Sequence, residues 1–256
     1  MALDLHAVEA RLGTDLIPRE AFEAFLDQYI RTQHPQINHP WVQMLFRGEL
    51  THDDLRVHAL QFEHFLRFAP SHFLMIGANA EPHTIPGPDD MRRDAVQNLM
   101  EDMGLTDPAG DHFAIWRRFP YALGLTKEDL DRSRPAPTTL AFNYAYLYFL
   151  KNLTHAEALA FQQFANESIF ALGLVERRRE ALTTYYGLDL EDTWSPPTAE
   201  EAQHVSKPRQ FVLDWADTPK RQARVFQLFQ HCYALWQVYY DGIYSLTVAK
   251  RQGAAH

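Results

Sequence analysis

Apolar residues recur at helical spacing along almost the whole chain of 256 residues, and no convincing run of alternating strand residues interrupts them. The segment 19–31 illustrates the pattern, because its apolar face collects Phe22, Phe25, Leu26, Tyr29 and Ile30. A chain of this length can bury roughly three quarters of its unfolded surface, so its size demands no covalent staple. The sequence therefore predicts an all-α protein.

The counts of cysteine and charge restrict the ligands and partners. The single cysteine, Cys232, excludes an internal disulfide and a Cys-rich zinc site, which leaves His and carboxylate ligands for a metal such as iron or manganese. A formal charge of -9 without a basic cluster argues against nucleic acid. No segment approaches the roughly eighteen apolar residues of a membrane span, and the first residues lack a signal-peptide core. We expect a cytoplasmic protein, not bound to a membrane, with a small-molecule partner.

Two acids and a histidine flank one turn in the segment 98–125. Glu101 and Asp102 end one predicted helix, and His112 lies near the start of the next, after a turn that contains Gly and Pro. His112 shares the inward stripe of its helix with Ile115, Trp116, Phe119 and Leu123. An inward histidine opposite a carboxylate is unusual, so we expect the acid and the histidine to converge on one point.

A further helix is predicted from Thr51 to His72. Thr51 is its expected N-cap, because two acids follow in the first turn, where the helix dipole favours them. Glu63, His64 and His72 lie among the aromatic residues of this segment. We interpret these three residues as solvated positions between core positions.

Glu167 is the most informative residue of a long helix predicted from His155 to Tyr186, which Gly187 would cap. Its neighbours on the helix face are Ala160, Phe164, Phe170, Ala171 and Leu174. An acid on an apolar stripe is costly without a partner. A core salt bridge and a metal site both explain it, and the helical period does not decide between them.

Glu201 and His204 stand one helical turn apart, as in the Glu-x-x-His motif of di-iron bundles. Glu201 also follows Thr198 at capping-box spacing. With 33 acids and 13 histidines in the chain, such a pair also arises by chance. The pair therefore indicates a metal site only in combination with other ligands.

Several stretches together resemble the PqqC/TenA/CADD-like superfamily, which has the haem-oxygenase-like helical fold. They are HPWVQMLFRGELTHDDLRVHALQFEHFLRFAP, NLMEDMG with a following His, IWRRFPYALGLTKEDL, FANES, YYGL and LWQVYYDG, in this order between about residues 39 and 244. The resemblance implies a single bundle of about eight helices over residues 39–250, an N-terminal helical extension over residues 1–38 packed on it, and a homodimer.

Within that superfamily the chain is most similar to the CADD-like haem-oxygenase-like di-metal oxidases, whose members use six metal ligands. Carried over by position, the first acid falls on Asp102, or on Glu101 if the register shifts by one, the first His on His112 and the central acid on Glu167. The resemblance thus implies one or two iron ions and O₂ as co-substrate.

The late ligand run of that group, H-x-x-x-D-x-x-H, is incomplete in this sequence. With His204 as the final His, Glu201 takes the place of the acid and Pro197 falls on the first His position. With His204 as the first His, Pro208 and Phe211 fall on the later positions. At least one ligand is missing in either register, so one ion would be bound more firmly than a second.

The resemblance implies an oxygen-dependent oxidoreductase whose non-haem iron site, mono- or di-iron, oxidises or cleaves a small amino-acid- or fatty-acid-derived metabolite. We expect an aromatic substrate pocket formed by Phe62, Phe65, Tyr144, Tyr148 and Phe164. The reactive Tyr of CADD-like oxidases corresponds to about Val42, so self-sacrificing use of that tyrosine is not implied.

Two other functions stay open from the sequence. PqqC-like members oxidise a quinone precursor without a metal, in a pocket of His, Arg and Tyr, for which Arg117, Arg118, Tyr146 and His204 are the candidates. The other possibility is a catalytically inactive member that binds a ligand or a protein through the same pocket.

Overall fold

The computed structural model describes residues 5–80, 91–105, 108, 111–188 and 198–253, and every regular element in them is a helix. The all-α prediction is confirmed, with more helices than the eight expected. The α-helices are α1 Leu5–Glu9, α2 Arg19–Gln33, α3 Pro35–Asn38, α4 Pro40–Phe46, α5 His52–Leu66, α6 Ala69–Ala78, α7 Met91–Asp102, α8 His112–Ala122, α9 Lys127–Arg132, α10 Pro137–Asn152, α11 His155–Leu159, α12 Leu174–Tyr186, α13 Thr198–Trp215, α14 Pro219–Tyr244 and α15 Lys250–Gly253. Two π-helical segments, η2 Ala160–Asn166 and η4 Ser245–Ala249, and the 3₁₀ segment η3 Glu167–Leu172 complete the series.

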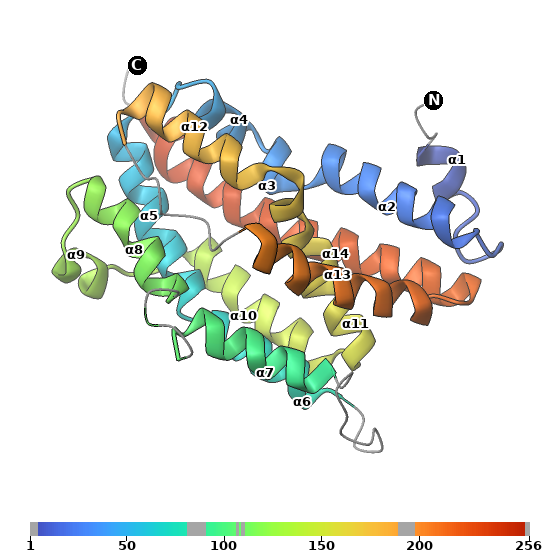
Figure 1. Cartoon of the computed structure of the whole chain (residues 1–256). Coiled ribbons are helices and arrows are strands. Elements are labelled where there is room, and N and C mark those ends of the chain that lie inside the picture. Colours follow the sequence, from blue (N-terminus) through green and yellow to red (C-terminus); the bar gives the residue numbers. More distant parts are fainter. Residues whose placement is uncertain (1–4, 81–90, 106–107, 109–110, 189–197, 254–256) are drawn as a thin grey trace.

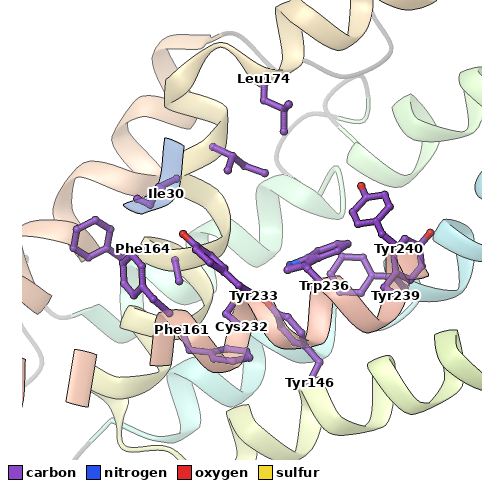
Figure 2. Packing of buried hydrophobic residues seen from close by; sticks show 14 of the residues in the cluster. Ile30, Tyr146, Phe161, Phe164, Leu174, Cys232, Tyr233, Trp236, Tyr239 and Tyr240 are labelled. Atoms are coloured by element: carbon purple, nitrogen blue, oxygen red, sulfur yellow. The ribbon is translucent and has the colours of Figure 1, made fainter. Parts of the chain in front are cut away.

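The long helix α14 runs through the bundle and contacts α10, η2, α2, α3, α4 and α5 (Figure 1). Its inward face carries Tyr233, Trp236, Tyr239 and Tyr240, and Figure 2 shows these side chains following one another along α14. Each of these α14 side chains is at most 5% exposed. Because fully burying one large apolar side chain stabilises a fold by about 1.5–3 kcal/mol, this aromatic layer is a major part of the core.

The first helices share that core. Phe22, Phe25, Leu26 and Ile30 of α2 are at most 1% exposed, and Phe25 packs against Phe226 of α14 with ring centroids 5.1 Å apart. The apolar face predicted for residues 19–31 is therefore the face that meets the bundle.

Two helix ends have the caps that the sequence predicts. Thr51 caps α5 in a capping box with Asp54, as the acids of the first turn indicate. Gly187 follows α12 with a φ of 65°, in the left-handed region that suits a glycine C-cap. Both predictions are confirmed.

The single helix predicted from His155 to Tyr186 is wrong. The segment begins as α11, widens into η2, tightens into η3 and turns at Gly173, with a φ of 75°, before α12 begins. Buried polar side chains, Gln162, Gln163 and Asn166, lie in the widened part. Hydrogen bonds to Gln162 and Asn166 from neighbouring helices fix a backbone that the 3.6-residue period does not predict.

None of the described helices has the length and hydropathy that crossing a membrane requires.

Candidate metal centre

The acid and the histidine predicted to converge do meet at the turn between α7 and α8. Oδ1 of Asp102 lies 2.8 Å from Nδ1 of His112, and the two side chains are 18% and 28% exposed. The pair therefore lies at a partly covered end of the bundle rather than in its deepest core.

Gly104 explains how the chain makes this turn. Its φ is 63°, its N–H donates to the carbonyl of Glu101, and the N–H of Leu105 donates to the carbonyl of Met100 at 2.8 Å. This is a Schellman C-cap, which ends α7 directly after Asp102. A Cβ on Gly104 would lie 2.8 Å from the Cβ of Asp111, so the close approach of the two helices also requires glycine.

Asp111 fixes the start of α8. Its Oδ1 accepts hydrogen bonds from the backbone N–H groups of Phe113 and Ala114, at 2.9 and 3.0 Å. His112 is thereby placed in the first turn of α8, facing the end of α7.

Glu101, the alternative ligand to Asp102, has a different neighbour. Its Oε1 accepts a hydrogen bond of 2.8 Å from Nε2 of Gln97, one turn earlier on α7. The carboxylate of Asp102 faces His112 at 2.8 Å, which is the arrangement that the unshifted register implies.

Glu167 begins the 3₁₀ segment η3 and is 9% exposed. Its Oε1 accepts a hydrogen bond of 2.9 Å from Nε2 of Gln162, and Gln162 in turn accepts a hydrogen bond from the hydroxyl of Tyr146. The burial expected for this acid is present, and its carboxylate belongs to a chain of buried polar groups.

The side chains of Glu201 and His204 lie outside the described residues, but the helix that carries them is described. α13 packs against η2, against η3, which begins with Glu167, and against α7, which ends with Asp102 (Figure 1). It therefore contacts both parts of the predicted ligand set.

The donor types fit iron, because carboxylate and imidazole are the ligands of non-haem iron sites. Within the part of the chain that the structure describes, no group of three or more His, Cys, Asp or Glu side chains converges as a metal site would require. Asp102 and His112 meet at the turn between α7 and α8, and Glu167 lies at the start of η3.

The five residues predicted to line an aromatic pocket differ in burial. Phe62, Phe65 and Phe164 are at most 7% exposed and face the interior. Tyr144 and Tyr148 are 61% and 67% exposed, so the expectation that they line an interior pocket is wrong. The helix α10 is apolar on most sides, and it turns Phe142 and Tyr146 inward instead, which leaves these two tyrosines on its outer face.

Three residues interpreted as solvated are in fact buried. Glu63 is 0%, His64 7% and His72 1% exposed. Oε1 of Glu63 accepts a hydrogen bond of 2.7 Å from Nη2 of Arg117, so the candidate Arg of a metal-free pocket is instead the partner of a buried acid. Burial lowers the pKa of His72 to about 3, which keeps this imidazole neutral.

Sequence reasoning missed Gln162 and its contact with Tyr146. The available signal was FQQFANE, in which polar residues stand where a regular helix would bury them. Such a conflict indicates a local departure from the α-helix, of the kind that often occurs at functional sites.

Comparison with solved structures defines the fold class. A CADD-like protein from Nostoc punctiforme superposes with a TM-score of 0.65 at 18% identity, over 88% of this chain and 98% of that one. A TenA homologue from Pseudomonas syringae gives a TM-score of 0.62 at 14% identity, over 90% and 97%. The protein therefore has the haem-oxygenase-like, TenA-like fold.

The family follows from the sequence. The model of the family described as iron-containing redox enzyme matches residues 56–237, and the chain belongs to this family. Two curated relatives, both named 4-aminobenzoate synthase, are 24% identical: one from Nitrosomonas europaea over 87% of this chain and 91% of its own length, and one from Chlamydia trachomatis over 75% and 79%. The protein is an enzyme of the oxidase or oxygenase type.

Proposed function

We propose that the protein is an oxygen-dependent oxidoreductase that holds non-haem iron, one or two ions, between α7, α8, η3 and α13. The observation that carries this proposal is the contact between Asp102 and His112 at a turn whose helix α7 packs on α13. Asp102, His112, Glu167, Glu201 and His204 would hold the ion. Bound iron would supply the redox chemistry with O₂.

The Asp102–His112 contact suits either of two roles. In the first role both side chains bind the ion. In the second, Asp102 accepts a hydrogen bond from the Nδ1–H of His112, and this bond turns Nε2 of His112 towards the ion. Histidine ligands commonly donate their second ring N–H to a carboxylate, which fixes the tautomer and the ring orientation. In the second role Asp102 orients His112.

The aromatic interior beside His112 would exclude water from the reaction. Trp116, one turn after His112 on α8, is 3% exposed and packs on Phe62 with ring centroids 4.6 Å apart. Phe62 continues to Phe65 at 5.5 Å. A dry, apolar wall of this kind strengthens polar interactions in a site and prevents side reactions with water.

We propose a small amino-acid- or fatty-acid-derived metabolite as the substrate. The names of the curated relatives, 4-aminobenzoate synthase, support a place in the biosynthesis of a small aromatic or related compound. By the resemblance, the reactive Tyr of CADD-like oxidases corresponds to about Val42, which is 0% exposed in α4. This position has no group to oxidise, so we propose that the substrate is an external molecule.

Iron loading tests the proposal. The apoprotein is given Fe(II) without oxygen, the iron bound per chain is measured, and O₂ consumption is followed after mixing with air. We expect about one to two irons per chain, lost in His112→Ala and Glu167→Ala and retained in the exposed control Glu180→Ala. No iron at any loading would contradict the proposal. A tightly held conjugated organic ligand without iron would favour a PqqC-like oxidase. The absence of both iron and organic ligand would favour a catalytically inactive member.

A further inference from the structure

Gln162 and Glu167 are brought together by the π-helical segment that separates them. They are five residues apart, and in an α-helix such residues lie about 140° apart around the axis, on different faces. The π-helix η2, with its i→i+5 repeat, places them on the same face. Nε2 of Gln162 then donates to Oε1 of Glu167 at 2.9 Å.

Tyr146 determines which way the amide of Gln162 points. Burial raises the pKa of Tyr146 well above its ordinary value, so the phenol stays protonated. Its hydroxyl donates a hydrogen bond to Oε1 of Gln162. With its oxygen occupied as an acceptor, the amide presents its NH₂ group to the carboxylate of Glu167. Tyr146 is 0% and Gln162 4% exposed, so little water competes for these bonds.

The widened segment is itself fixed by the neighbouring helices. Oδ1 of Asn166, the last residue of η2, accepts hydrogen bonds from Nε1 of Trp236 at 2.7 Å and from Nε2 of Gln36 at 3.3 Å. These bonds come from α14 and α3, and they fix the backbone directly before Glu167. The orientation of Glu167 is therefore set from two sides, by Gln162 and by the backbone.

We propose that Gln162 is a positioning residue that orients the carboxylate of Glu167 for the metal, and that Tyr146 holds Gln162 in place. The inference rests on the proposed iron function, in which Glu167 is a ligand. Hydrogen-bonding partners outside the ligand set typically change metal affinity by about tenfold to a hundredfold when they are removed. Neither residue is part of the ligand pattern that the family resemblance implies.

The Fe(II) dissociation constant tests the proposal directly, by competition with a chelator under anaerobic conditions. Gln162→Met keeps the length of the side chain and removes both hydrogen bonds, and we expect iron binding about tenfold to a hundredfold weaker. Tyr146→Phe should weaken it less, because the amide stays in place. The matched control is Gln61→Met, since Gln61 is also buried but bonds to the backbone of Arg134 and Ala136; it should bind iron as the unmodified protein does.

A second measurement needs no iron. In the apoprotein, thermal unfolding of Gln162→Met, Glu167→Met and the double variant forms a mutant cycle, because each replacement removes one partner of the hydrogen bond. We expect the shift in Tm of the double variant to differ from the sum of the two single shifts, because the two side chains share a hydrogen bond. If Gln162→Met does not fold, Tyr146→Phe takes its place in both measurements.

The outcomes separate this inference from the iron function. If the unmodified protein binds iron, Glu167→Ala loses it and Gln162→Met binds it normally, the positioning role is overturned while the function stands. If no iron binds at all, the function fails. Additive shifts in Tm would overturn the contact between Gln162 and Glu167 whether or not iron binds.

Discussion

The two described parts of the candidate centre are built in different ways. The turn between α7 and α8 uses standard helix ends, a glycine C-cap after Asp102 and an aspartate N-cap before His112. The segment around Glu167 departs from the α-helix, and buried side chains from α3, α10 and α14 hold it. Local sequence therefore places the Asp102–His112 pair, whereas tertiary contacts place Glu167.

The largest expected effect concerns the acid at the first of these parts. Asp102→Asn should weaken Fe(II) binding about tenfold to a hundredfold, because Asp102 faces His112. Glu101→Gln is the matched control and should bind iron normally, since Glu101 bonds to Gln97. Chelator competition measures both. The opposite ranking of the two variants would show that the register shifts by one and that Glu101 is the ligand.

The next effect tests whether the turn is set locally. Gly104→Ala should lower the free energy of unfolding by about 2 kcal/mol or more, because it combines left-handed backbone strain with a contact to Asp111. Gly187→Ala is the control, with a φ of 65° and nothing within 4 Å of the added Cβ, and should cost about 1 kcal/mol. Urea unfolding of both variants gives the difference. Equal costs would show that the approach of Gly104 to Asp111 does not constrain the turn.

The smallest expected effect is a pH dependence of the stability, caused by His72 near the segment around Glu167. The ring of His72 packs against Tyr146 in a tilted arrangement with centroids 4.8 Å apart, and burial lowers the pKa of His72 to about 3. In the unfolded chain its pKa is about 6.5, so below that pH the unfolded state binds a proton that the folded state does not, and stability falls as the pH falls towards 3. Because of His72, the free energy of unfolding should fall by about 1 kcal/mol when the pH is lowered from 7.5 to 6.

Replacing His72 by Leu should remove that share of the acid sensitivity, whatever its effect on stability at pH 7.5. Urea unfolding of the variant and the unmodified protein at both pH values measures the difference. His34 and His58 keep their own acid sensitivity in both proteins, because burial, followed by the charge of Arg178, lowers the pKa of each to about 3. An unchanged pH slope in the variant would show that His72 titrates normally in the folded protein.

Local spacing predicted the elements whose structure depends on near neighbours. The all-α class, the cap at Thr51, the C-cap at Gly187 and the meeting of Asp102 with His112 are of this kind. In each case the deciding hydrogen bonds or dihedral angles lie within a few residues, which is the range over which a sequence pattern carries information.

The errors share a different cause. Periodicity shows which residues share a face of a helix, but several faces of α5 and α10 are apolar or mixed, and it does not show which face meets a neighbour. Tyr144 and Tyr148 were expected inside and lie outside, whereas Glu63 and His72 were expected to be solvated and are buried. Glu63 is tolerated there because Arg117 of α8 bonds to it, and that contact joins residues 54 positions apart.

The sequence by itself determined the helical class, the helix ends and the meeting of Asp102 with His112, because caps and left-handed glycines act through contacts within one turn. The tertiary structure alone decided the surroundings of Glu167. Trp236, Gln36 and Tyr146 reach the widened segment from distant parts of the chain, and their buried hydrogen bonds hold a π-helical backbone against the regular period. The orientation of that acid is therefore a property of the assembled bundle.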